Sequence, residues 1–217
     1  MECVSAGPPW AAWWRSWTCR SKKTVIAAER DEAVRAAWRA QMATVDPTTI
    51  IFLDETHTPT TLTPLRARAP RGVRAVGSVP RGRWQTTSWL ATLTPAGIGP
   101  SVVVPGTIDG LAFDAFVQHL LAPTLRPGHL VVLDNLSVHK SPRARAAIEA
   151  TGAHLAFLPT YSPDLNPIEL AFAKIKTALR RAEARSFDRL VPALSTALET
   201  ITATDAQAFY RAAGYAA

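Results

Sequence analysis

Residues 129–159 read HLVVLDNLSVHKSPRARAAIEATGAHLAFLP, with two short apolar runs on either side of a helical pattern. Buried strands are predicted over HLVVLD (129–134) and HLAFLP (154–159). Between them, PRARAAIEAT (142–151) predicts a short helix that stops at Gly152. A strand, a helix and a strand in this order favour a parallel pair joined by a right-handed crossover.

The chain before and after this unit continues the alternation. Further strands are predicted over IIFLD (50–54), SWLATLT (88–94) and SVVVP (101–105), with a turn at Pro95, Gly97 and Gly99. A helix capped by Asp109 has its apolar residues at 3.6-residue spacing, namely Leu111, Phe113, Phe116, Val117, Leu120 and Leu121. Helices are also expected from Asn166 onward and near 188–201. The element order predicts a mixed α/β sheet flanked by helices.

The first 47 residues differ in character from the rest. Residues 24–43 predict a helix with Val34, Trp38 and Met42 on one face, ended by Asp46 and Pro47. We therefore expect a poorly ordered Trp-rich tail at 1–21, a helical linker at 22–47 and one domain at 48–217. The tail is either an interaction arm with exposed aromatic side chains or a stretch that belongs to no fold because the reading frame begins mid-gene.

Composition narrows the class of protein. The 217 residues include 24 Lys and Arg against 17 Asp and Glu, a net charge of +7, which favours a polyanionic partner over a merely basic surface. The two cysteines, Cys3 and Cys19, exclude a disulfide scaffold and are typical of a reducing cytoplasm. No secretory signal or membrane-length apolar run is visible, so no membrane partner is expected. The absence of a Gly-rich phosphate loop or nucleophile motif disfavours a small-molecule α/β enzyme.

Three carboxylates stand at positions where α/β proteins build sites. Asp54 and Asp134 each end an apolar strand, and Glu169 follows the predicted N-cap Asn166 and first-turn Pro167 of a helix. Each has a structural alternative: an Asp after a strand is a common turn former, and Asn166 with Glu169 has the spacing of a capping box. If the three converge, oxygen ligands of this kind suit Mg²⁺.

Three strings then resemble a known family: FLDETHT (52–58), VVLDNLSVHK (131–140) and LPTYSPDLNPIELAFAKIK (158–176). They are similar to the catalytic blocks of the DDE transposases of bacterial insertion sequences in the mariner-like superfamily, including the 34 residues between Asp134 and Glu169. The resemblance implies an RNase H-like mixed sheet flanked by helices. It also implies that Asp54, Asp134 and Glu169 hold two Mg²⁺ or Mn²⁺ ions, and that the protein nicks DNA and transfers strands at insertion-sequence ends.

Neighbouring residues of these blocks are expected to support the site. Asn135 and His139 would orient a metal-bound water or contact phosphate; the alternative is a loop Asn and a partly exposed His. Asn166 would cap the helix and so help to present Glu169. By strand alternation Glu55 points away from Asp54 and is interpreted as structural.

Basic residues cluster where acidic ones are absent. Residues 56–108 contain no Asp or Glu, and the Gly- and Pro-rich interval 66–83 predicts a hairpin that lies on DNA phosphates, although a solvated charge run is the usual alternative. The predicted DNA contacts are Arg66, Arg68, Arg71, Arg74, Arg81, Arg83, Lys140, Lys174 and Lys176.

The resemblance lacks one part, since only about 45 residues precede the first strand and leave no room for a helix-turn-helix reader of element ends. A frameshift-split element with a separately encoded reader, or a truncated remnant, is therefore expected. The predicted partners are DNA (element ends and target) and a second copy on DNA, in a bacterial cytoplasm near the nucleoid. The alternatives are a non-catalytic DNA-binding remnant and a metal-dependent endonuclease without strand transfer.

Overall fold

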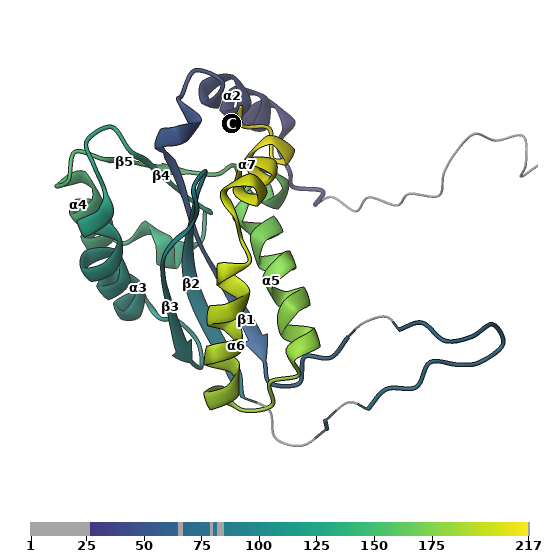
Figure 1. Ribbon diagram of the computed structural model, residues 1–217. Coiled ribbons are helices and arrows are strands. Elements are labelled where there is room, and N and C mark those ends of the chain that lie inside the picture. Colours follow the sequence, from purple (N-terminus) through teal and green to yellow (C-terminus); the bar gives the residue numbers. More distant parts are fainter. Residues whose placement is uncertain (1–26, 65–66, 79, 82–84, 217) are drawn as a thin grey trace, which may run out of the picture.

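The computed structural model describes residues 27–64, 67–78, 80–81 and 85–216. The predicted tail at 1–21 therefore lies outside the described residues, as do Arg66 and Arg83. Figure 1 shows a sheet with α3 and α4 on one face and α5 and α6 on the other. In the part of the chain that is described, no helix is long and apolar enough to cross a membrane.

The sheet has five strands in the order β3-β2-β1-β4-β5. They are β1 (Ile50–Pro59), β2 (Thr86–Thr94), β3 (Gly97–Pro105), β4 (Leu130–Leu133) and β5 (His154–Phe157). The first three strands pair antiparallel, whereas β4 pairs parallel to both β1 and β5. The predicted mixed α/β sheet is confirmed, with β1 at its centre.

Helices cover both faces of this sheet. They are α2 (Glu32–Met42), α3 (Gly110–Phe116), α4 (Pro142–Glu149), α5 (Ile168–Ala182), α6 (Phe187–Glu199) and α7 (Ala203–Ala212). Because side chains alternate along a strand, β1 contributes side chains to two hydrophobic cores, one on each face of the sheet. Phe52 is buried with residues of α5, α6 and α7, and Leu53 with residues of α3 and α4. Asp54, two residues after Phe52, therefore faces the α5 side.

Three details of the predicted elements are wrong. Strand β1 does not end at Asp54 but continues to Pro59, because β2 pairs with it along this extension. The turn between β2 and β3 occupies Pro95 and Ala96 alone, since Thr94 already pairs with Gly97. Helix α7 was not predicted, whereas the helix predicted near 188–201 is present as α6.

Two predicted helix faces also differ from the structure. In α2, Val34 is 51% exposed, while Arg35 lies fully buried beside Trp38 and Met42. The helix starts at Glu32 because the Asp31 carboxylate accepts hydrogen bonds from the N–H groups of the first turn. After Asp109, Leu111 and Leu120 are exposed. Leu120 leaves the buried face because the α-helix changes to a π-helical turn over Val117–Leu121 and the spacing shifts; Leu111 lies earlier, in the first turn of α3.

Candidate active site

The sheet register places Asp54 and Asp134 at equivalent positions on neighbouring strands. The last parallel pair of β1 and β4 is Phe52 opposite Val132, and each aspartate follows its member of that pair by two residues. Asp54 is nearly buried at 5% exposed, whereas the Asp134 side chain, just beyond the end of β4, is 33% exposed. The two carboxylates therefore lie at the same level along the strands, Asp54 within β1 and Asp134 just past the end of β4.

Asp134 is held by its own loop. One carboxylate oxygen accepts hydrogen bonds from the N–H of Leu136 at 3.0 Å and from Nδ1 of His139 at 2.5 Å. His139 is completely buried, not partly exposed, and its ring centroid lies 4.8 Å from that of Phe113 in α3, with the two ring planes tilted by 32°. The buried imidazole of His139 is held between the Phe113 ring and the Asp134 carboxylate, and its hydrogen bond fixes the orientation of that carboxylate.

Asn166 has a different role from the predicted one. Helix α5 begins at Ile168 with no side-chain cap, so neither the N-cap hydrogen bond of Asn166 nor the capping box with Glu169 forms. Instead, Asn166 Nδ2 donates to Asp54 Oδ2 at 2.7 Å, while the N–H of Glu55 donates to Asp54 Oδ1. The residue that precedes α5 therefore ties the start of that helix directly to the central strand.

All three predicted carboxylates line one cavity of about 380 Å³. Asn135 and Asn166 also line it, together with residues that the sequence did not single out, namely Leu136, Leu158, Pro159, Thr160 and Ser162. Glu169 reaches it from the first turn of α5. Most of these unpredicted residues belong to the segment 158–163, where Tyr161 takes up a left-handed backbone conformation with φ of 54°. The cavity is therefore walled by the strand ends and by the loop before α5.

The carboxylates of this cavity differ in their proton affinity. Burial raises the pKa of Asp54 to about 7; the N–H of Glu55 opposes this rise, and the charges of the other two carboxylates add to it. The pKa of Glu169 is also raised by burial, against the opposing charge of Lys176. For Asp134, burial is outweighed by the hydrogen bonds from His139 and the loop backbone, and the pKa lies below its ordinary value.

These shifts describe a site with unneutralised negative charge, which is the electrostatic situation that a divalent cation relieves. Among the described residues, no three His, Cys, Asp or Glu side chains are gathered closely enough to form a ready ligand cluster. Mg²⁺ does not require one, because it commonly keeps several waters and takes one or two carboxylates together with substrate phosphates. The donor set and the size of the cavity therefore fit such an ion.

Comparison with known proteins agrees with this geometry. A family model described as "DDE superfamily endonuclease" matches residues 49–191. The chain belongs to the DDE superfamily endonucleases. No curated protein sequence matches this DDE endonuclease significantly.

Solved structures of Mos1 mariner transposase share the fold. The pre-cleavage Mos1 transpososome matches with a TM-score of 0.73 and 14% identity over 94% of this chain and 65% of that one. The Mos1 paired-end complex with Mn matches with a TM-score of 0.75 and 15% identity, over 94% of this chain and 66% of that one. The isolated Mos1 catalytic domain matches with a TM-score of 0.60 and 14% identity, over 88% of this chain and 90% of that one. The predicted RNase H-like fold is confirmed, and the chain spans about two thirds of the length of the longer Mos1 chains.

The predicted DNA contacts of the DDE endonuclease that the structure describes are four arginines and three lysines. Arg68, Arg71, Arg74 and Arg81 are exposed on the segment 61–85, which contains no strand in its described part and runs out from the body in Figure 1. The segment turns at Gly72, where φ is +85°, so it is an irregular excursion rather than the strand hairpin that we predicted. None of these four arginines lines the acidic cavity.

The three lysines are placed differently from one another. Lys140 is exposed beyond His139. Lys176 is half-buried on α5, and its pKa is lowered, chiefly by burial, although the charge of Glu169 opposes this. Lys174 donates to Asp205 at 2.8 Å and to the backbone oxygen of Thr200, which ties α5 to the start of α7. Lys176 is thus a predicted DNA contact whose charge interacts with that of Glu169, and Lys174 already has a structural role.

Proposed function

We propose that this chain is the catalytic part of a metal-dependent DNA transposase that nicks DNA at element ends and transfers the freed strands to a target. The observation that carries the proposal is the convergence of Asp54, Asp134 and Glu169 on one cavity, from three separate elements of the fold. Membership of the DDE superfamily endonucleases supports the reaction class.

The same three carboxylates would hold two Mg²⁺ or Mn²⁺ ions. Mos1 paired-end complexes have been solved with Mn and with Mg, which supports divalent ions here. Two bound ions would stabilise the attacking and leaving oxygens of a phosphodiester together, in hydrolysis and in strand transfer alike.

The chain's own groups would prepare this site. Asn166 fixes the direction of the Asp54 carboxylate through its 2.7 Å hydrogen bond, and His139 does the same for Asp134. A carboxylate held in one orientation loses little conformational entropy when it binds. The exposed arginines of the segment 61–85, together with Lys140 and Lys176, would bind the DNA backbone around the cavity. Asn135, which also lines the cavity, would contact a phosphate oxygen.

The proposal extends to the partners and the source. DNA ends and target are the substrates, supported by the transposon-end DNA of the Mos1 complex that shares this fold. A second copy on DNA, a separately encoded end-reading part and an origin in a bacterial insertion sequence complete the proposal. Light scattering of the chain with and without end DNA would test the second copy.

The test of the catalytic proposal compares the wild type with Asp54→Asn, Asp134→Asn and Glu169→Gln on end-containing DNA, with Mg²⁺ and with EDTA. Asp188→Asn is a matched control, because Asp188 occupies the first turn of α6 as Glu169 occupies that of α5, but it does not line the acidic cavity. We expect nicking by the wild type and Asp188→Asn and none by the triad variants. Equal nicking by the wild type and triad variants would refute the assignment.

The products separate transposase activity from the two other functions. Joined products, in which a freed 3′-hydroxyl is attached to target DNA, are expected from a transposase. Nicked DNA without joined products would instead identify an endonuclease. Binding without metal-dependent cleavage would identify a non-catalytic remnant.

A further inference from the structure

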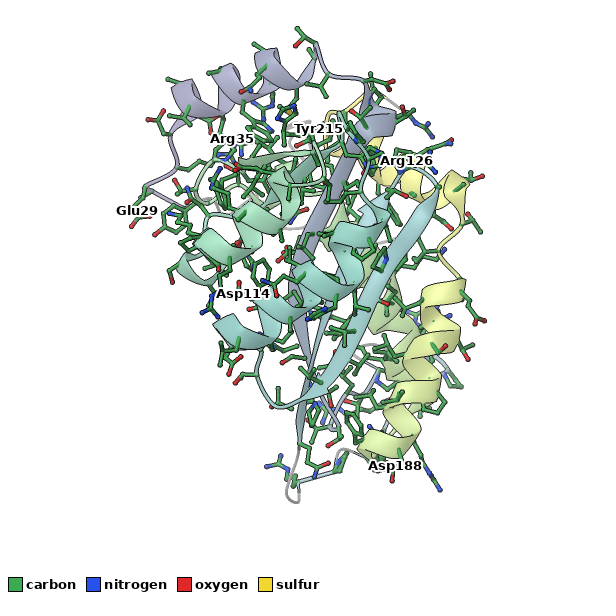
Figure 2. All side chains as sticks on the ribbon, turned by 90° about the vertical axis from the view of Figure 1, so that its left-hand side faces the viewer. Glu29, Arg35, Asp114, Arg126, Asp188 and Tyr215 are labelled. Atoms are coloured by element: carbon green, nitrogen blue, oxygen red, sulfur yellow. The ribbon has the colours of Figure 1, made fainter. Side chains whose placement is uncertain are left out.

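Helix α2 carries a charged side chain in an unusual place. Arg35 is completely buried, on the side of α2 that faces the body of the molecule (Figure 2). Its Nη1 and Nη2 donate to the two carboxylate oxygens of Asp164 at 3.0 and 2.6 Å. A buried guanidinium is costly unless it is paired in such a two-pronged way, so the position of α2 and that of Asp164 depend on each other.

A second connection joins the same helix to the next residue of the same loop. Trp38 Nε1 donates to the hydroxyl of Tyr215 at 3.1 Å, and that hydroxyl donates to the backbone oxygen of Leu165 at 2.7 Å. Trp38 and Tyr215 are 8% and 5% exposed, so both hydrogen bonds are shielded from water. Arg35, Trp38 and Tyr215 all lie outside the matched family region 49–191.

The loop that these two connections hold is the one that walls the acidic cavity. Asp164 and Leu165 immediately precede Asn166, whose side chain binds Asp54, and Glu169 follows within one helical turn. The loop also includes Tyr161 in its left-handed conformation, which a non-glycine residue keeps only when its surroundings enforce it. Contacts from outside the loop are therefore needed to keep its shape.

We infer that Arg35 and the Trp38–Tyr215 pair are positioning residues, and that α2 sets the geometry of the loop that places Asn166 and Glu169 at the active site. The inference rests on the proposed function for its catalytic consequence, but the coupling itself is a property of the fold. A displacement of α2, which directly follows residues 1–31, would move the backbone from Asp164 to Asn166. The segment upstream of the catalytic domain would thereby influence the catalytic carboxylates without touching them.

Hydrogen exchange tests the coupling directly in the full chain. Tyr215→Phe removes only the hydroxyl. Asp164→Asn removes the charge and replaces one of the two oxygens that accept from Arg35 with an amide NH2 group. We expect about tenfold faster exchange of the loop amides that make backbone hydrogen bonds, with β4 amides unchanged. The amides expected to exchange faster are those of Leu165, Asn166 and Glu169.

Two matched controls separate positioning from general destabilisation. Tyr210→Phe removes a buried hydroxyl that donates to backbone oxygens of Ile50 and Leu93 in the sheet. Asp205→Asn removes a carboxylate paired with a lysine of α5. Neither control should change exchange at Leu165 or Asn166 selectively. Unchanged loop exchange in Tyr215→Phe and Asp164→Asn, or the same change in the controls, would overturn the inference.

Metal dependence tests the catalytic consequence. In Asp164→Asn, the Mn²⁺ concentration for half-maximal nicking should rise about tenfold, as is typical when groups that orient metal ligands are lost. An unchanged Mn²⁺ requirement in a nicking-competent protein would contradict the inference. If the wild type does not nick at all, the proposed function fails, while the exchange result still decides the coupling.

Discussion

Replacing Asp54 with Asn should make the protein more stable at neutral and alkaline pH when divalent ions are absent. The carboxyl group is 5% exposed and lies on the same cavity as two other carboxylates. Its pKa is about 7, raised from an ordinary value of 3.8 first by burial and then by those neighbouring charges. An amide keeps the size and one acceptor oxygen and carries no charge, but it can accept from only one of the two donors, Asn166 Nδ2 and the N–H of Glu55.

The sign and size of the effect follow from proton binding. Between about pH 4 and 7 the folded wild type binds a proton at Asp54 that the unfolded chain has released, so its stability falls as pH rises through this window. Above pH 7, the full difference between the folded and unfolded pKa of Asp54 corresponds to a loss of about 4 kcal/mol in the free energy of unfolding. Relaxation of the charged site reduces this, so we expect the variant to be more stable by ~2–4 kcal/mol at pH 8 and equal near pH 4.

Urea unfolding of the wild type and Asp54→Asn at pH 4, 6 and 8 in EDTA measures this difference. Asp205→Asn is the control of opposite sign. The pKa of Asp205 is lowered to about 2, chiefly by the hydrogen bond from Lys174, so its carboxylate stabilises the fold above about pH 4 and this stabilisation is lost as pH falls toward 2. A pH-independent difference in the free energy of unfolding between wild type and Asp54→Asn, or a less stable variant at pH 8, would show that the Asp54 charge does not destabilise the fold.

Three further predictions concern the DNA contacts, the site and the sheet. Replacing Arg68, Arg71 and Arg74 by Gln should flatten the salt dependence of DNA binding by up to about 0.9 per lost phosphate contact; an unchanged slope would exclude them from the interface. His139→Gln, which changes the group that orients Asp134, should lower metal-dependent nicking about 10- to 100-fold while the protein stays folded by circular dichroism. Gly99→Ala should lower the free energy of unfolding by ~1–3 kcal/mol, because the added Cβ would lie 2.5 Å from Thr92 Oγ1, and a Thr92→Ala background should remove most of that loss.

The central part of the fold could be predicted because its signals are local. The apolar runs of β4 and β5 are bounded by turn residues and separated by a capped helix, so each element is specified by its own sequence. The extent of β1 was not predictable in this way. Beyond Asp54 it reads ETHTP, which carries no apolar run, and it remains a strand because β2 pairs with it. The pairing partner, which is distant in sequence, supplies the missing signal.

In the candidate site, too, the residues with a local sequence signal could be predicted and the long-range contact could not. Asp54, Asp134 and Glu169 were found because each stands beside a recognisable element, and the cavity brings them together. The interaction of Asn166 with Asp54 joins residues 112 positions apart and has no local signature. At the sequence level, a helix cap accounted fully for Asn166, so a satisfactory local explanation concealed the long-range contact.

The error at α2 has a more general cause. A periodic search for apolar residues selects Val34 for the buried face, whereas the structure buries the charged Arg35. Hydrophobic patterning treats every charged residue as exposed, so it fails where a buried charge is paired with a carboxylate. The partner here is Asp164, 129 residues away, in the loop that walls the active-site cavity. A well-packed apolar residue at position 35 would stabilise this helix without fixing the direction of the loop, whereas a two-pronged ion pair fixes both distance and orientation. The sequence therefore departs from the apolar pattern at position 35, where stability of the helix and placement of the cavity loop favour different side chains.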